Sequence, residues 1–236
     1  MKTIGLIGGM SWESSLEYYR IVNETIKLRL GGLHSAQCLM YSVDFAGIER
    51  LQHAGRWDEA GDVMADAARR LERGGADFVV LCTNTMHRLA GAIEAAVSIP
   101  LLHIADPTAE AIRAAGITKI GLLGTAFTME QEFYRGRLTE KYGLDVLIPE
   151  ADERAVIHRV IYEELVLGIV REDSRAAYQR IIDHLIARGA QGIILGCTEI
   201  MLLIAPEDCP VPSFDTTTLH AVAAADFALE THISGS

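Results

Sequence analysis

Residues 75–85 read Gly-Ala-Asp-Phe-Val-Val-Leu-Cys-Thr-Asn-Thr, and residues 189–199 read Gly-Ala-Gln-Gly-Ile-Ile-Leu-Gly-Cys-Thr-Glu. The two stretches align without a gap about 114 residues apart, and in this alignment Thr83 stands opposite Cys197. Upstream, residues 4–9 (Ile-Gly-Leu-Ile-Gly-Gly) are echoed by residues 120–125 (Ile-Gly-Leu-Leu-Gly-Thr). The repeat therefore predicts two similar lobes, of which only the second carries a thiol at the equivalent position.

Short β-rich runs alternate with helical patterns along the whole chain. We expect strands at 3–7, 36–43, 78–81, 100–104, 119–123 and 211–215, and helices at 14–30, 45–54, 57–73, 87–96, 108–115 and 219–229. This order predicts parallel sheets covered by helices on both faces. We predict an α/β protein of two pseudo-symmetric flavodoxin-like lobes, 1–98 plus 212–236 and 99–211, with the active site in the cleft between the lobes.

The composition is that of an ordinary globular protein, with half of the 236 residues hydrophobic and 22% charged. A net charge of −11 disfavours nucleic acids and anionic membranes as partners. The N-terminus reads as a strand and not as a secretory signal, and no apolar run reaches the roughly 20 residues of a membrane span. The four cysteines lack the spacing of a disulfide framework or a zinc site. We therefore expect a cytoplasmic protein without a metal.

Ligands of parallel α/β sheets bind beyond the carboxyl ends of the strands, and the notable motifs all lie there. Gly8-Gly9-Met10-Ser11 follows the first strand and opens a helix, so it is either an anion-binding turn or a tight structural turn. Its glycine spacing differs from the dinucleotide fingerprint, which disfavours NAD.

Cys197 ends the second copy of the repeated strand. A cysteine in this position is often a packing residue, but the repeat favours a functional one. An ordinary thiol pKa near 8.5 can be lowered at a helix N-terminus, which makes Cys197 a candidate thiolate base.

Residues 81–87 (Leu-Cys-Thr-Asn-Thr-Met-His) and 195–200 (Leu-Gly-Cys-Thr-Glu-Ile), together with the opening turn 5–11, resemble the signatures of the aspartate/glutamate racemase family. The resemblance covers almost the whole chain and is strongest to its bacterial broad-specificity members that act on L-aspartate and L-glutamate. It implies a racemase of acidic amino acids that forms a homodimer. It also implies that Cys197 takes the α-proton of the L-enantiomer, that Thr83 serves the opposite face, and that Met10, Gln52 and Thr125 line the pocket.

Inverting an α-carbon by proton transfer requires one group on each face of the substrate. Pyridoxal phosphate would need a Schiff-base lysine, and none of the four lysines lies in a motif. We therefore expect no cofactor. A hydroxyl is a poor proton acceptor, so reaction from the D-enantiomer should be slow.

Several polar side chains are candidates for holding the substrate. Asn84, Thr85 and Thr198 can donate hydrogen bonds to its carboxylate, and Glu199 can orient the ammonium or a neighbouring donor. For Gln52, a solvated helix face is an equally good interpretation. His87 and His103 are expected to be supporting residues. Glu163-Glu164 are expected on a solvated helix face, and the alternative is a helix that borders the cleft.

Members of the family usually carry a cysteine directly before the Asn-Thr pair, whereas this chain has Thr83 there and Cys82 one place earlier. Strand alternation turns Cys82 away from the cleft, unless a local bulge brings it in. A single thiol also suits a decarboxylase of the arylmalonate type or a hydantoin-type racemase. A two-lobed small-anion binding protein without chemistry is the alternative from another class.

Overall fold

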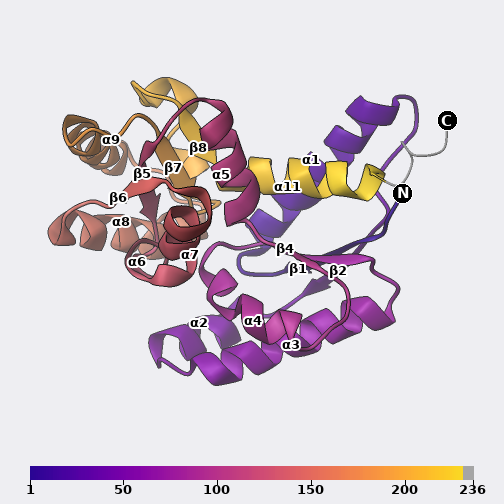
Figure 1. Cartoon of the computed structure of the whole chain (residues 1–236). Coiled ribbons are helices and arrows are strands. Elements are labelled where there is room, and N and C mark those ends of the chain that lie inside the picture. Colours follow the sequence, from indigo (N-terminus) through magenta and orange to yellow (C-terminus); the bar gives the residue numbers. More distant parts are fainter. Residues whose placement is uncertain (231–236) are drawn as a thin grey trace. The chain divides into compact units, whose positions relative to one another are not determined.

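The computed structural model describes residues 1–230, so the last six residues of the predicted first lobe, 231–236, lie outside the described residues. The chain divides into two compact units, Met1–Ile104 with the segment from His220 (unit 1) and Ala105–Leu219 (unit 2) (Figure 1). Each unit contains one parallel four-stranded sheet with helices against it. The predicted α/β class with two similar sheets is confirmed.

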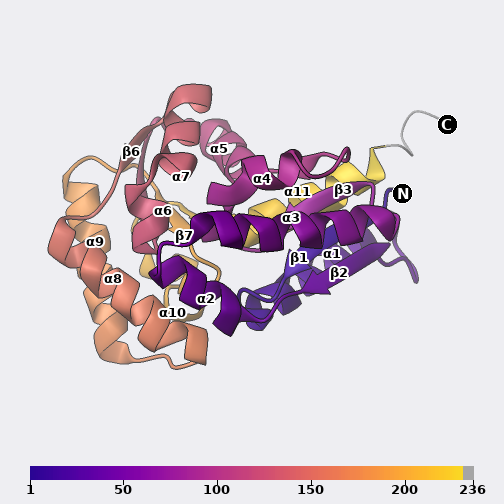
Figure 2. The same ribbon diagram turned by 90° about the horizontal axis from the view of Figure 1, so that it is seen from below.

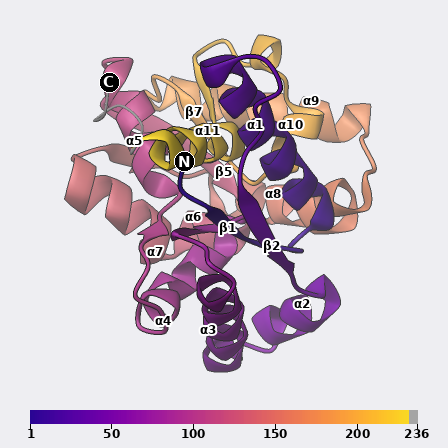
Figure 3. The ribbon, with the colours of Figure 1, turned by 90° about the vertical axis from the view of Figure 1, so that its right-hand side faces the viewer.

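Unit 1 is built on a sheet in the order β2-β1-β3-β4. Its strands are β1 (Ile4–Gly8), β2 (Cys38–Ser42), β3 (Phe78–Leu81) and β4 (Leu101–Leu102). Its helices are α1 (Trp12–Leu30), α2 (Phe45–His53), α3 (Trp57–Arg73), the 3-10 helix η1 (Thr85–Leu89), α4 (Ala90–Glu94) and most of α11 (Thr216–Leu229). Both faces of the sheet are covered, by α1 and α11 on one side and by α2, α3 and α4 on the other (Figures 1 and 3).

Unit 2 repeats this plan with a sheet in the order β6-β5-β7-β8. Its strands are β5 (Lys119–Gly124), β6 (Asp145–Leu147), β7 (Ile193–Gly196) and β8 (Ser213–Asp215). Its α-helices are α5 (Ala105–Ala114), α6 (Ala126–Glu130), α7 (Glu132–Gly136), α8 (Ala151–Glu163), α9 (Glu172–Ala187) and α10 (Ile200–Leu203). Short turns of other helix types complete it: η2 (Arg137–Lys141), η3 (Leu165–Leu167) and η4 (Pro206–Asp208). Figure 2 shows α8 and α9 side by side.

The two copies of the sequence repeat pair in the same register. In unit 1, β1 lies beside β3 with Ile7 opposite Leu81. In unit 2, β5 lies beside β7 with Leu123 opposite Leu195. Because the aligned residues have equivalent partners, the turns that follow β3 and β7 leave their sheets at equivalent places.

Three helices begin or end at other residues than predicted, because caps, a proline and a 3-10 turn determine the ends of a helix. The helix expected over 87–96 is a 3-10 turn followed by the short α4. Helix α5 begins at Ala105, earlier than expected, because Pro107 fits in a first helical turn, where a backbone N–H has no intrahelical partner. Helix α1 begins at Trp12 because the Ser11 hydroxyl caps it by accepting the Ser14 N–H.

A half-buried ion cluster ties α5 to η2 within unit 2. The Arg137 guanidinium donates Nε–H and Nη2–H to the two carboxylate oxygens of Asp106, both at 2.7 Å. Lys141 Nζ adds a third hydrogen bond to Asp106 at 3.0 Å. Burial would raise the pKa of Asp106, but these hydrogen bonds outweigh it and hold the pKa at about 2.

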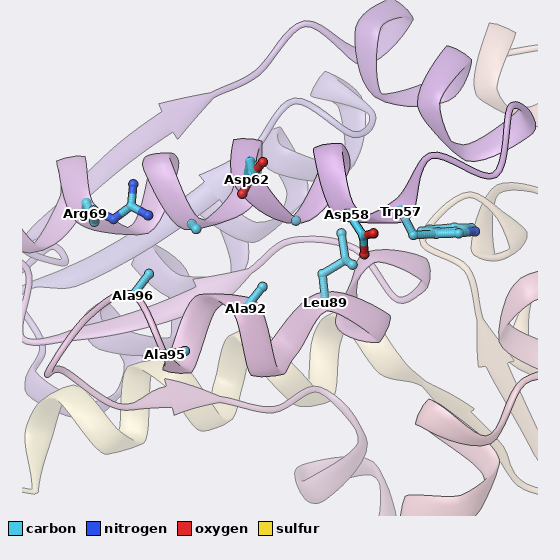
Figure 4. Close-up of a pocket in the computed structure, with 10 residues that line it drawn as sticks. Trp57, Asp58, Asp62, Arg69, Leu89, Ala92, Ala95 and Ala96 are labelled. Carbon is cyan, nitrogen blue, oxygen red and sulfur yellow. The ribbon is translucent and has the colours of Figure 1, made fainter.

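Among residues 1–230, no helix combines the length and the apolar character that a membrane crossing requires. A surface hollow of about 370 Å³ lies between α3 and α4 (Figure 4). Asp58, Asp62 and Arg69 of α3 line it on one side, and Leu89, Ala92, Ala95 and Ala96, in and around α4, line it on the other. Its lining residues belong to α3, α4 and the ends of α4.

Candidate active site

In unit 1, the backbone N–H groups of Cys82 and Thr83 have different hydrogen-bond partners in the turn after β3. The Cys82 N–H still continues the sheet by donating to the Ile7 carbonyl at 2.9 Å. The Thr83 N–H instead folds back onto the Leu81 carbonyl at 2.8 Å, so the ladder ends there. The Ser14 hydroxyl donates a hydrogen bond to the carbonyl of Cys82 at 3.1 Å.

Cys82 points into the core and away from the strand-end edge. Its side chain is fully buried in the cluster that includes Tyr18 and Ile21. Burial raises the pKa of the Cys82 thiol far above its ordinary range. The turn thus contains no bulge that would expose Cys82, and Thr83 is the residue that keeps some exposed surface.

The other expected pocket residues of unit 1 lie close to the same turn. Gln52 is 4% exposed and donates its amide to Met86 Sδ at 3.0 Å, which contradicts its interpretation as part of a solvated helix face. Met10 packs in the cluster that contains Met86. Asn84 and Thr85 follow Thr83 directly and are buried.

The glycine turn after β1 is closely packed against neighbouring main chain and side chains. The Gly9 N–H donates to the Ser15 hydroxyl at 2.7 Å, so this amide already has an acceptor within the protein. A Cβ on Gly8 would lie 2.5 Å from the same hydroxyl. A Cβ on Gly9, whose φ is +92°, would lie 2.2 Å from the Val43 carbonyl. The glycines are required for this close packing.

In unit 2, Cys197 and its neighbours share one carboxylate. The Cys197 thiol donates to Glu199 Oε2 at 2.9 Å, and the Thr198 hydroxyl donates to the same oxygen at 2.7 Å. Gly196 precedes this cluster at a point where a Cβ would lie 2.7 Å from the Leu123 carbonyl. The close approach of β5 and β7 therefore brings Thr125, which follows β5, to the same edge as Cys197.

The electrostatics around Cys197 differ from the expectation of a lowered pKa. Burial, followed by the negative charge of Glu199, raises the pKa of the Cys197 thiol well above its ordinary value. Helix α10 has only four residues, so its dipole is too weak to offset a carboxylate within hydrogen-bond distance. The resting side chain is thus a thiol that donates to Glu199, and it retains partial exposure to solvent.

Thr125 acts as a helix cap in the structure. Its hydroxyl accepts the Thr128 N–H at 3.3 Å, and the next amide, Ala126 N–H, donates to His158 Nδ1 at 3.2 Å. Thr125 is 5% exposed. The amide of Ala126 is thus already used within unit 2, whereas Thr125 stays at the strand-end edge.

Glu164 is a residue that the sequence analysis misplaced. Glu163 is exposed as expected, but the Glu164 side chain is buried, accepts a hydrogen bond from the Ser174 hydroxyl at 2.7 Å and lies 3.5 Å from Arg159. Burial, assisted by the negative charge of Glu164, raises the pKa of Tyr178. Helix α8 ends at Glu163, and Glu164 is its C-cap with φ −126° and ψ −67°, so the helical pattern does not determine the direction of its side chain.

His87 and His103 are buried side chains of unit 1 whose rings lie 4.6 Å apart. Neither ring is exposed to solvent at the surface of unit 1. Among residues 1–230, no cluster of three or more His, Cys, Asp or Glu side chains is arranged to hold a metal ion. All four cysteines are free thiols.

Comparison with known proteins places the chain. Residues 7–224 match the model of the Asp/Glu/Hydantoin racemase family. A solved structure of a proposed Asp/Glu racemase from Yersinia pestis is 58% identical and superposes with a TM-score of 0.91, covering 97% of this chain and 100% of that one. An aspartate racemase homologue from Pyrococcus horikoshii OT3 is 34% identical with a TM-score of 0.83, covering 97% and 99% of the two chains. The broad specificity amino-acid racemase RacX of Bacillus subtilis (strain 168) is 27% identical over 164 residues, 68% of each chain. The chain therefore belongs to the Asp/Glu/Hydantoin racemase family.

Proposed function

We propose that this protein is a cofactor-independent amino-acid racemase that converts L-aspartate and L-glutamate to their D forms. The observation that carries the proposal is the matched register of the two repeats, which gives Thr83 and Cys197 equivalent positions at the ends of equivalent strands. Family membership supports the reaction class, and the names of the relatives support acidic amino acids as substrates.

In the proposed mechanism, Cys197 is the base for the L-enantiomer and Glu199 activates it. The thiol proton passes to the Glu199 carboxylate along the existing 2.9 Å hydrogen bond. The positive ammonium of the substrate favours this step, because a nearby cation stabilises a thiolate. The thiolate then removes the α-proton and becomes a thiol again.

Thr83 completes the inversion in this proposal. Its hydroxyl, directly or through a water molecule, delivers a proton to the opposite face of the planar intermediate. Water then restores the proton on Thr83, and Glu199 releases its proton to water. Because a hydroxyl is a far weaker base than a thiolate, the reaction should run faster from L than from D substrates.

We assign the remaining polar side chains to holding the substrate carboxylates. Asn84, Thr85 and Thr198 can donate hydrogen bonds where negative charge accumulates. The amides of Gly9 and Ala126 are assigned no such role, because they already donate within the protein. We further propose that the protein works as a homodimer in the cytoplasm, where free thiols such as these stay reduced.

The test is proton NMR of L- and D-aspartate and of L- and D-glutamate in deuterated water. We expect the wild type to incorporate deuterium at the α-carbon faster from the L substrates. Cys197→Ser should lose this exchange, whereas Thr83→Cys should gain exchange from the D substrates. Cys209→Ser, which removes another half-buried thiol of unit 2, is the matched control and should behave as wild type. A wild type that exchanges D substrates faster than L would refute the assignment of the two faces.

A further inference from the structure

The carbonyl of Thr83 is held by a buried histidine. His87 Nδ1 lies 2.7 Å from the Thr83 oxygen, and the other ring nitrogen, Nε2, lies 3.2 Å from the Ile104 backbone nitrogen. His87 is 1% exposed. Both ring nitrogens therefore form hydrogen bonds with the main chain of unit 1. Nδ1 bonds to Thr83, four residues earlier in the chain, and Nε2 bonds to Ile104, just after β4.

These two partners fix the protonation of the ring. A backbone N–H can only donate, so Nε2 must carry a lone pair and accept the Ile104 N–H. A carbonyl can only accept, so Nδ1 must carry the proton and donate it to Thr83. His87 is a neutral imidazole with its proton on Nδ1, and protonating Nε2 would place two N–H groups against each other.

A second buried histidine of unit 1, His220, has different hydrogen-bond partners from His87. His220 Nε2 donates to the Leu102 carbonyl at 2.8 Å, and its Nδ1 lies 2.8 Å from the Tyr18 hydroxyl. His220 is equally buried and its ring lies 5.7 Å from that of His87. It binds the end of β4, whereas His87 bonds to the turn that carries Thr83.

We propose that His87 is a positioning residue for Thr83, an inference that rests on the proposed function. With the Thr83 N–H bound to Leu81 and its carbonyl bound to His87, both peptide groups of Thr83 are fixed. The branched Cβ of threonine then leaves few rotamers for the hydroxyl. His87 does not act on the substrate, because it cannot give up the Nδ1 proton without releasing the Thr83 carbonyl.

Two conservative variants of His87 each keep one of its two hydrogen bonds and remove the other. His87→Asn places an amide N–H at the position of Nδ1 and keeps the donor to Thr83, but loses the acceptor for Ile104. His87→Gln reaches the position of Nε2 and keeps that acceptor, but loses the donor to Thr83. His220→Asn is the control, because it removes a buried histidine of the same unit that does not bond to Thr83.

The measured quantity is the ratio of D-aspartate formed to deuterium incorporated into L-aspartate, starting from L-aspartate in deuterated water. Exchange with retention needs only Cys197, whereas formation of the D-enantiomer also needs Thr83. We expect His87→Gln to lower this ratio on the order of 10- to 100-fold, the cost of a misplaced catalytic group. His87→Asn and His220→Asn should keep the ratio near that of the wild type, even where they lower the melting temperature.

An equal loss of the ratio in His87→Asn and His87→Gln, or a loss in neither, would overturn the positioning role alone. A wild type without any exchange would instead refute the proposed function and the positioning role together. Nitrogen-15 NMR of the wild-type histidines gives a readout that is independent of activity and of variant folding. We expect the Nδ1-protonated tautomer for His87 at neutral pH, and an Nε2-protonated ring would overturn the inference.

Discussion

The ion cluster at Asp106 predicts a specific dependence of stability on pH. The pKa of Asp106 is about 2 in the folded protein, compared with 3.8 for an unperturbed aspartate. This lowered pKa stabilises the folded state by about 2 kcal/mol at neutral pH, because each pKa unit corresponds to about 1.4 kcal/mol. The contribution is fully present above the unfolded pKa and is lost as the pH falls through the folded one. At about pH 3 it should have decreased to about 1.3 kcal/mol.

The assay is urea unfolding of the wild type and of Asp106→Asn across this range of pH. At neutral pH the variant should have a free energy of unfolding lower by about 2 kcal/mol, and the difference should shrink on acidification. Asp145→Asn is the control, because Asp145 is 62% exposed and pairs with Lys119 at 3.4 Å, and exposed pairs contribute less than about 1 kcal/mol. A difference for Asp106→Asn that stays constant down to about pH 2 would refute the reasoning.

Two further substitutions test the electrostatics and the packing next to the candidate catalytic groups. Glu199→Gln removes the charge that raises the pKa of Cys197, so iodoacetamide should alkylate Cys197 at lower pH than in the wild type. Peptide mass spectrometry follows that alkylation, and an unchanged pH profile would contradict the assigned cause. Cys82→Ala should cost about 1 kcal/mol of stability through lost core packing and leave deuterium exchange per folded molecule unchanged. If Cys82→Ala keeps exchange into L-aspartate but no longer forms the D-enantiomer, Thr83 is not the group on the second face.

The repeat was a reliable predictor of the sheets because register follows from the pattern of apolar residues. The alignment of 75–85 with 189–199 corresponds to equivalent pairings of β3 with β1 and of β7 with β5. The same pattern placed Thr83 and Cys197 just beyond the carboxyl ends of β3 and β7, because the apolar runs end at Leu81 and Gly196. Successive strand residues also point to opposite faces. The turned-away position of Cys82 follows from this alternation.

The sequence could not predict features that depend on side chains meeting across the fold. The pKa of Cys197 is raised first by burial and then by Glu199, whose carboxylate lies 2.9 Å from the sulfur, a contact that spacing alone does not determine. Of the adjacent pair Glu163 and Glu164, only the second is buried, because its partner Ser174 lies on the following helix. His87 has one partner four residues away and another 17 residues away, and only the first is visible as a local pattern.

The protonated state of Cys197 has a consequence for oxidative damage. Peroxides attack thiolates much faster than thiols, and exposed thiolates are the cysteines that become sulfenic acid. By holding its proton against Glu199, the resting sulfur stays a poor nucleophile toward hydrogen peroxide. In the resting protein, Cys197 should therefore react more slowly with hydrogen peroxide than a cysteine held as a thiolate.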